Sequence, residues 1–192
     1  IKTRSLELLT NWNGNMMAGS PEPLIYATWV ETFIKMLLED ELSFNPSSAN
    51  MATPLFLEKV LRNYKNAGAW CDIKHSDKFE TCAELSKKSL TKSLRKLKDA
   101  YGADVDKWRW GNERRIKHPS YSVGGTLIPK FLTEISTEIP GNTHTLNSTK
   151  LIDRSIDGEA KSSSLKIIFD FSSPNKNMFI HSTGQTGHKI SR

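Results

Sequence analysis

The first half of the chain carries apolar residues at helical spacing. Four stretches show this spacing, separated by polar loops or glycines: residues 5–14, 20–42, 54–68 and 78–102. In the second stretch, Ser20 can cap a helix and Pro21 suits its first turn. The pattern therefore predicts four helices, with ends near Gly14, Gly68 and Gly102.

Two of these stretches have a well-defined apolar side. In the second stretch the apolar side recurs at fourfold spacing: Ile25, Trp29, Phe33 and Leu37. In the fourth it consists of five residues, with lysines around the rest of the helix: Leu85, Leu90, Leu94, Leu97 and Tyr101. We expect the first stripe to be core rather than a cofactor site, because one apolar face on a helix is normally buried.

The second half of the chain changes to strand-like patterns. Three runs are alternating or rich in β-branched and aromatic residues: residues 143–148, 163–171 and 175–184. The turn "SSPN" parts the last two, which predicts an antiparallel hairpin. Helices followed by strands indicate an α+β fold. Because two or three strands make a poor independent sheet, we expect them to join a sheet supplied by other segments.

The length and charge of the chain set broad limits on its function. Its 192 residues suit one domain or a large piece of one, and hydrophobic residues make up 37%. The net charge is +6, concentrated in Lys87–Lys98, which holds no acid. A solvated helix face is the favoured interpretation of this run, with a nucleic-acid or membrane surface as the alternative. The start at Ile1, without a signal-peptide pattern or an apolar run of spanning length, indicates a fragment or subunit.

Two cysteines flank a polar loop. Cys71 and Cys82 are eleven positions apart and could form a disulfide, which would place the chain outside the reducing cytosol. Free thiols remain possible. A zinc site would add His75 and an acid such as Asp72, but no CxxC or paired-histidine spacing supports it.

Motifs for cofactor or nucleophile chemistry are weak. The run "STGQTGHK" lacks the spacing of a phosphate-binding loop and has no helical pattern after it. The histidines form no metal-binding pair, and no G-x-S-x-G elbow is present. These residues therefore predict no catalytic, cofactor-binding or metal-binding set in this chain.

The stretch "DKWRWGNERRIKHPSY", residues 106–121, mixes aromatic and basic residues. This mixture suits single-stranded nucleic acid, where bases stack on aromatic rings. However, Trp108 and Trp110 would share one face of an extended segment, with Arg109 on the other. A buried structural corner is therefore an equally good interpretation.

The order of the motifs along the chain resembles a known family. They run "LLTNWNG", "LIYATWVETFIKMLL", "WCDIKHSDKFETC", "WRWG", "IPGNTHTLN", "SSLKIIFDF" and "HSTGQTGHKIS". In this order they resemble the C-terminal part of the β chain in the penicillin acylase (penicillin amidase) family of N-terminal-nucleophile (Ntn) hydrolases, over nearly all 192 residues. The chain departs from the family pattern at four positions: Asn13 and Ile73 replace aspartates, Thr186 replaces a serine, and Arg114 stands where relatives often have histidine.

The resemblance implies a fold and an activity. Residues 1–105 would be the helical segment and 106–192 the loop and strand segment of one αββα Ntn-hydrolase domain, incomplete as a lone chain. The parent enzyme would hydrolyse an acyl amide bond, as in penicillin or an acyl-homoserine lactone. Its nucleophile is a serine exposed at the new N-terminus of the β chain, whose own α-amine is the base. That serine would lie upstream, so we expect no catalytic residue, cofactor or metal in this chain.

The resemblance also implies roles for particular residues. It favours the disulfide Cys71–Cys82 and a structural motif of five residues: Trp108, Trp110, Gly111, Gly184 and Gly187. The implied partners are the remainder of the β chain, the α chain and a small acyl amide substrate, in the bacterial periplasm or a secreted form. The alternative is a non-enzymatic basic helical domain that binds nucleic acid or an acidic surface through Lys87–Lys98 and Arg109–His118.

Overall fold

The computed structural model describes six parts of the chain: residues 1–42, 53–74, 76–119, 134–151, 160–163 and 165–181. The chain divides into two compact units. Unit 1 comprises Ile1–Trp12 and Leu24–Lys107, and unit 2 comprises Asn13–Pro23 and Trp108–Arg192. The short segment Asn13–Pro23 therefore leaves the helical unit and joins the unit that contains the strands. The prediction that both units belong to one Ntn-hydrolase domain stays a prediction.

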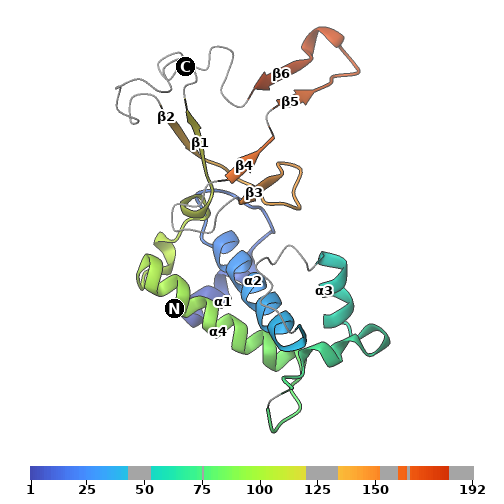
Figure 1. The fold of residues 1–192 in the computed structure, drawn as a ribbon. Coiled ribbons are helices and arrows are strands. Elements are labelled where there is room, and N and C mark those ends of the chain that lie inside the picture. The colour runs from blue at the N-terminus through green and yellow to red at the C-terminus, as the bar shows by residue number, and fades with distance from the viewer. Residues whose placement is uncertain (43–52, 75, 120–133, 152–159, 164, 182–192) are drawn as a thin grey trace. The chain divides into compact units, whose positions relative to one another are not determined.

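Helices make up unit 1 (Figure 1). The α-helices are α1 (Lys2–Asn11), α2 (Glu22–Glu41), α3 (Pro54–Leu61) and α4 (Cys82–Tyr101). Among its described residues the unit also contains two 3-10 helices, η2 (Tyr64–Cys71) and η3 (Val105–Lys107). Four helices in the first half confirm the sequence prediction. No helix in the described parts of the chain combines the length and hydropathy that a membrane crossing needs.

The sequence explains where α4 begins and ends. The Thr81 hydroxyl accepts a bond from the Glu84 N–H, and the Glu84 carboxylate accepts one from the Thr81 N–H. This capping box satisfies two N–H groups that would otherwise lack a partner at the start of the helix. Gly102 ends the helix with a φ of 84°, a conformation that glycine adopts readily.

The two predicted apolar stripes form core. The most buried residues of the α2 stripe are Ile25, Phe33 and Leu37, each at most 5% exposed. Trp29 is half-buried, and its Nε1 donates to the Ser86 carbonyl and the Ser89 hydroxyl of α4. The four leucines of the α4 stripe are buried, while Tyr101 is half-buried. Each buried leucine contributes about 2 kcal/mol of hydrophobic transfer free energy, so these stripes hold α2 and α4 in unit 1.

The third helix is shorter than predicted. It ends at Leu61, not near Gly68, and Asn63, Lys65 and Asn66 take positive φ angles of 51°, 52° and 65°. Asparagine tolerates this left-handed conformation, and the Asn63 Oδ1 accepts a bond from the Gly68 N–H. This local bonding competes with the helix, so the chain turns into η2, which contains Gly68.

The bounds of the other helices also differ slightly. The helix α1 ends at Asn11, three residues before Gly14, and α2 begins at Glu22, after Pro21. The helix α2 thus begins two residues after Ser20, whose carbonyl accepts a bond from the Trp110 N–H. The Ser20 carbonyl therefore bonds within unit 2.

The described strands of unit 2 form three antiparallel pairs. These are β1 (Arg115–Pro119) with β2 (Glu134–Glu138), β3 (Thr149–Leu151) with β4 (Ala160–Ser162), and β5 (Leu165–Ile168) with β6 (Met178–His181). The predicted hairpin of the last pair is confirmed, and its turn contains the 3-10 helix η5 (Pro174–Lys176). Together with the helices, these pairs confirm an α+β fold.

One strand prediction was wrong, and two strand pairs were not predicted. Residues 143–148 form turns rather than a strand, because the side chains of Asn142 and Thr145 bond to nearby backbone groups. The pair β1–β2 was not predicted at all. Its strands are polar and include His118 and Pro119, so they lack the apolar alternation that marks a strand.

Candidate functional site

The tryptophan stretch forms a buried corner in unit 2. Trp108 and Trp110 are 0% and 1% exposed, whereas Arg109 between them is exposed. Arg109 has an extended backbone, and the 3-10 helix η4 (Trp110–Glu113) begins directly after it. The extended backbone places neighbouring side chains on opposite sides, as the structural interpretation of the sequence required. Since both rings are buried, they offer no stacking surface for nucleotide bases.

Three backbone bonds attach residues 16–20 to this corner. The Trp110 N–H donates to the Ser20 carbonyl at 3.0 Å, and the Gly111 N–H donates to the Ala18 carbonyl at 2.8 Å. The Gly141 N–H donates to the Met16 carbonyl, also at 2.8 Å. These bonds explain why Asn13–Pro23 belongs to unit 2.

Arg114 is the buried charge at the centre of the corner. Its guanidinium carbon lies 4.5 Å from the centroid of the Trp110 ring, and its Nη1 donates to the Thr149 carbonyl at 2.9 Å. The Arg114 carbonyl also accepts a bond from the Ile139 N–H at 3.0 Å. A planar guanidinium can stack on an indole and donate in its own plane at the same time, which an ammonium group cannot do. Arg114 therefore connects η4, the start of β3 and the end of β2.

Gly141 begins a compact loop that bonds to the indole of Trp110. Its carbonyl accepts a bond from the Trp110 Nε1 at 2.9 Å, and its φ is 93°. A side chain at Gly141 would collide with the backbone oxygen of Asn147. Only glycine fits both the left-handed conformation and the close approach of the backbone. The loop is then closed by the Thr149 N–H, which donates to the Asn142 carbonyl at 3.0 Å.

Gly111 lies directly against Glu138. A methyl group at Gly111 would come within 2.9 Å of the Glu138 Cβ. The Glu138 carboxylate accepts a bond from Arg115 at 2.9 Å across the β1–β2 pair. The small size of Gly111 thus allows β2 to approach η4.

The second polar cluster lies in unit 1, around the disulfide. Cys71 and Cys82 are joined, with their Cα atoms 4.9 Å apart, so the expected disulfide is present and neither thiol is free. Cys71 is fully buried beside the core residues Val60 and Leu85. The bond connects the end of η2 to the first residue of α4.

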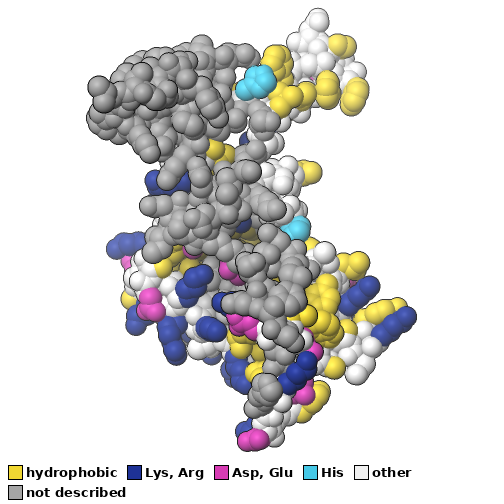
Figure 2. All heavy atoms as spheres, in the orientation of Figure 1, with side chains coloured by type: hydrophobic (Ala, Val, Ile, Leu, Met, Phe, Trp, Pro, Cys, Tyr) yellow, Lys and Arg dark blue, Asp and Glu magenta, His cyan; other side chains and the backbone are white. Residues whose placement is uncertain are grey.

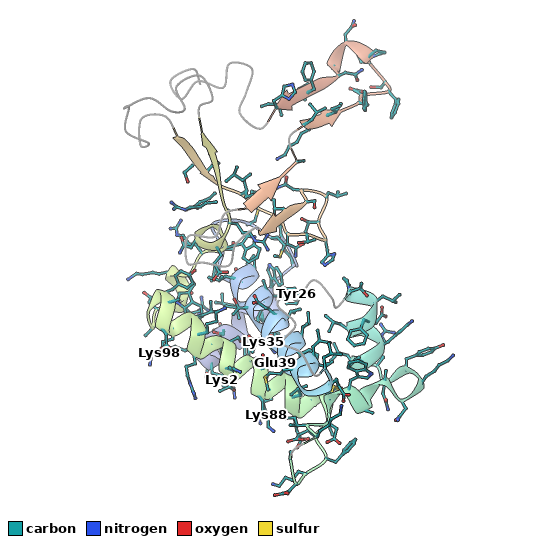
Figure 3. All side chains as sticks on the ribbon, in the orientation of Figure 1. Lys2, Tyr26, Lys35, Glu39, Lys88 and Lys98 are labelled. Carbon is teal, nitrogen blue, oxygen red and sulfur yellow. A yellow bond between two sulfur atoms is a disulfide. The ribbon has the colours of Figure 1, made fainter. Side chains whose placement is uncertain are left out.

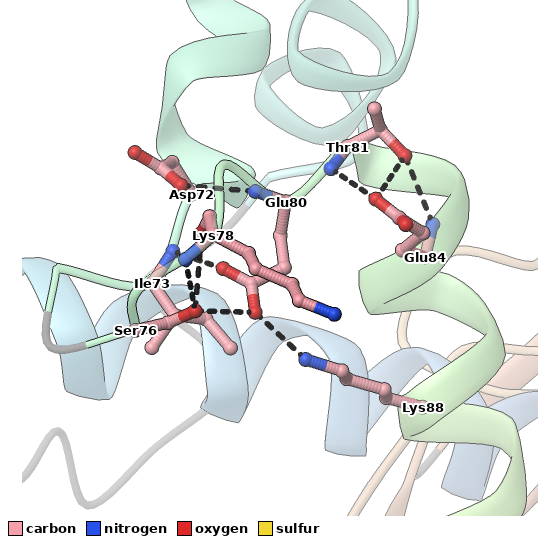
Figure 4. A network of polar contacts seen from close by, with 8 residues as sticks. All are labelled: Asp72, Ile73, Ser76, Lys78, Glu80, Thr81, Glu84 and Lys88. Carbon is pink, nitrogen blue, oxygen red and sulfur yellow. Dashed lines mark hydrogen bonds and ion pairs between the residues drawn. The ribbon is translucent and has the colours of Figure 1, made fainter.

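Within the loop closed by this disulfide, Glu80 organises the backbone (Figure 4). One carboxylate oxygen accepts bonds from the Ser76 hydroxyl at 3.0 Å and the Lys88 ammonium at 2.8 Å. The other oxygen accepts a bond from the Ile73 N–H at 3.2 Å, while the Glu80 N–H donates to the Asp72 carboxylate at 3.0 Å. Glu80 is only 6% exposed, and three hydrogen-bond donors satisfy its carboxylate in place of water.

These contacts shift the acidity of two carboxyl groups. The bond from the Lys88 ammonium, helped by Ser76 and the Ile73 N–H, holds the pKa of Glu80 below its usual value despite desolvation. The Thr81 N–H and hydroxyl lower the pKa of Glu84 in the capping box. Both carboxylates are therefore favoured in their charged, structure-forming state at neutral pH.

Neither cluster contains a candidate metal site among the residues that the structure describes. Within the described ranges, no three His, Cys, Asp or Glu side chains gather in a way that could hold a metal ion. The disulfide uses both sulfurs of the alternative zinc site, and His75 lies outside the described residues. Gly184 and Gly187, the other two residues of the expected structural motif, also lie outside them. The hydrogen bonds of both clusters hold neighbouring backbone segments together.

Sequence reasoning did not identify three important residues of these clusters. Gly141 lies in the "IPGN" turn, so a proline–glycine pair before polar residues was the available signal. Glu80 had no local signal, because its partners come from the loop and from α4. Thr149 contributes its carbonyl oxygen, which any residue could supply, so no pattern of side chains could have revealed it.

Similarity to known proteins is found at the level of a protein family. Neither the curated proteins nor the solved structures gave a match to this chain. The family model described as penicillin amidase does match, and it covers residues 2–192. Because that match includes the tryptophan corner, the disulfide loop and all the strands, the chain belongs to the penicillin amidase family.

Proposed function

We propose that this chain is the C-terminal part of the β chain of a penicillin acylase-like amidohydrolase, and that it serves as scaffold rather than as catalyst. The parent enzyme hydrolyses an acyl amide, such as penicillin, an acyl-homoserine lactone or a related amide. The family match over residues 2–192 supports the amidohydrolase class. In this proposal the N-terminal serine, its α-amine base and the donors to the oxyanion belong to other segments of the parent.

The β5–β6 hairpin is the observation that carries the scaffold role. All eight residues of its two strands are exposed. The register places Ile167 opposite Phe179 on one face and Ile168 opposite Met178 on the other. Both faces of the hairpin are therefore apolar, as is typical of a strand pair that is covered on both sides.

The residues that follow β5 extend this apolar surface. Phe169 is 62% exposed and Phe171 is 97% exposed. A two-stranded hairpin is marginally stable by itself in water, and so much exposed apolar area favours addition to a larger sheet. A central sheet of an αββα sandwich would give the hairpin neighbouring strands in the plane of the sheet. It would also cover both faces of the hairpin with packed elements. This agreement supports the Ntn-hydrolase sandwich as the fold of the parent.

The partners and the compartment follow from the same proposal. The remainder of the β chain and the α chain of the parent would cover the hairpin. A periplasmic or secreted location is supported by the disulfide between Cys71 and Cys82, since such bonds persist in oxidising compartments.

Amide hydrolysis tests the functional part of the proposal. The full-length protein that carries this chain is expected to hydrolyse a phenylacetyl amide or an acyl-homoserine lactone, and the isolated chain is expected to hydrolyse neither. Turnover by the isolated chain would disprove the scaffold role. Failure of the full-length, processed protein on a panel of acyl amides would disprove the amidohydrolase class.

Hydrogen exchange tests the structural part. Amides of β5 and β6 should exchange fast in the isolated chain and slowly in the full-length protein. The double variant Ile167→Lys/Phe179→Lys should weaken assembly with the rest of the parent, whereas Asn175→Lys, in the hairpin turn, should not. Equal exchange rates in both proteins would show that nothing covers the hairpin.

A further inference from the structure

The outer face of α4 is strongly basic. Six cationic side chains are exposed on this helix: Lys87, Lys88, Lys92, Arg95, Lys96 and Lys98. Lys88 pairs with Glu80, but no ion pair within the described residues involves the other five. The carboxylates of the helix itself are Glu84, which is held in the capping box, and Asp99. The face therefore keeps an excess of uncompensated positive charge.

The geometry of the helix presents these charges as one surface. The helix has 20 residues, which corresponds to a length of about 30 Å. Lys88, Lys92 and Lys96 follow one another at fourfold spacing, so they lie along the same side. Figure 3 labels Lys88 and Lys98 towards opposite ends of α4, and Figure 2 shows Lys and Arg side chains along this part of the molecule. The basic residues thus extend along most of the helix.

The opposite side of α4 is not available for binding. Its four leucines are buried, together with Ser89 and Ser93. The helix consequently cannot turn its apolar side towards a membrane without leaving the fold. Any partner must be held by charge, at the surface.

The residue types on this face favour one kind of anionic partner. The face has no aromatic side chain on which bases could stack, which argues against single-stranded nucleic acid. Five of its six cations are lysines, which act as flexible point charges, whereas bidentate recognition of phosphates or bases favours arginine. A straight row of lysines held outwards by a rigid helix suits a flat and diffuse array of negative charge. Clusters of four to eight basic residues on an amphipathic helix are typical of proteins that bind anionic lipid surfaces.

We propose that the basic face of α4 binds the headgroups of an anionic lipid bilayer, peripherally and without insertion. Each lysine near such a surface adds a similar increment of attraction, so the binding increases with the number of basic residues and weakens with salt. The proposal is independent of the amidohydrolase activity, because α4 and its charges exist whatever reaction the parent catalyses.

Vesicle co-sedimentation of the full-length protein tests the proposal. Vesicles of phosphatidylcholine with phosphatidylglycerol should retain the protein at low salt, and vesicles of phosphatidylcholine alone should not. Raising the salt from about 0.05 M to about 0.5 M should release it. The triple variant Lys92→Glu/Arg95→Glu/Lys96→Glu should lower the partition coefficient roughly hundredfold. The corresponding triple glutamine variant should give a smaller loss.

A matched control separates a defined surface from general charge attraction. The variant Lys59→Glu/Lys65→Glu/Lys176→Glu changes the net charge by the same amount at exposed positions outside α4. It should retain most of the binding. An equal loss in both variants would overturn the proposal, as would a lack of retention on anionic vesicles at low salt.

Two further measurements can also contradict the proposal. Lys92 and Lys96 should react with an amine-acetylating reagent in the free full-length protein and be protected by anionic vesicles. No reaction in the free protein would mean that another part of the parent covers the face. Tighter binding to duplex DNA than to anionic vesicles at the same salt would assign the face to nucleic acid instead.

Discussion

The guanidinium of Arg114 stacks on the ring of Trp110 at 4.5 Å and donates to the Thr149 carbonyl at 2.9 Å. One side chain thereby joins an aromatic anchor to a strand that is 35 positions away in sequence. This contact links η4 to β3 within unit 2.

Replacing Arg114 should destabilise unit 2. In Arg114→Ala, the Thr149 carbonyl loses a charged donor and Trp110 loses its stacked cation, which together should cost about 3 kcal/mol of unfolding free energy. Arg114→Lys keeps the charge but loses the planar stacking, so it should cost about half as much. Denaturant unfolding of the full-length protein, followed by tryptophan fluorescence, measures both.

The control for this prediction is the neighbouring arginine. Arg109 is exposed, so Arg109→Ala should change the unfolding free energy by less than about 0.5 kcal/mol. Equal effects of the two alanine variants would show that burial and stacking at Arg114 contribute nothing to stability.

Gly141 should be intolerant of any side chain. Gly141→Ala introduces a methyl group into a left-handed residue and against the Asn147 backbone oxygen, and should cost more than about 2 kcal/mol. The same substitution at Gly102 isolates the cost of the backbone conformation, because Gly102 also has a positive φ but an added methyl group there would meet no atom within 4 Å. Gly102→Ala should therefore cost about 1 kcal/mol. If thermal unfolding of the full-length protein gives the same loss for both variants, the collision with Asn147 is not important.

How far the sequence predicted this fold differs between the two units. In unit 1 the signals were local: a fourfold apolar stripe in the second stretch and Gly102 at the end of the fourth. The helices followed from these signals. The turn at Asn63 did not, because it depends on the Asn63 Oδ1, which accepts a bond from the Gly68 N–H five residues later.

In unit 2 the decisive contacts are remote in sequence. The sequence indicated that Trp108 and Trp110 share a face, but not that Ser20 and Ala18 would pair with Trp110 and Gly111. Backbone carbonyls, such as those of Gly141 and Thr149, have no residue signature at all. The β5–β6 hairpin was the exception, since two β-branched and aromatic runs parted by the turn "SSPN" already predicted it. That other segments cover it stays a prediction.

Reduction of the disulfide should loosen unit 1. The bond closes a loop across eleven positions, for which the chain-entropy model gives about 3 kcal/mol of stabilisation. Dithiothreitol should lower the unfolding free energy by about that amount, measured by denaturant unfolding with and without the reductant. The double variant Cys71→Ala/Cys82→Ala should be similarly destabilised and should no longer respond to dithiothreitol. A response in that variant would place the effect of the reductant elsewhere.

Acid should weaken the loop that Glu80 organises. Contact with Lys88 above all lowers the pKa of Glu80 below its usual value of 4.5, so its charged form stabilises the folded state. A carboxyl group with a lowered folded pKa contributes its full stabilisation above the unfolded pKa, and that contribution disappears as pH falls through the folded pKa. Stability measured from pH 7 down to about pH 3 should therefore fall below about pH 4.5.

Two variants test whether Glu80 causes part of this pH dependence. Glu80→Gln removes the titrating group, so the protein should be less stable at pH 7 and should lose less stability on acidification. Lys88→Met removes the largest cause of the lowered pKa and should also flatten the profile, because the folded and unfolded pKa values of Glu80 become more alike. Both profiles can be measured by thermal unfolding, with hydrogen exchange of the Ile73 amide as a local readout, since that amide donates to the Glu80 carboxylate. Unchanged acid profiles in both variants would show that the acid response arises from other carboxyl groups.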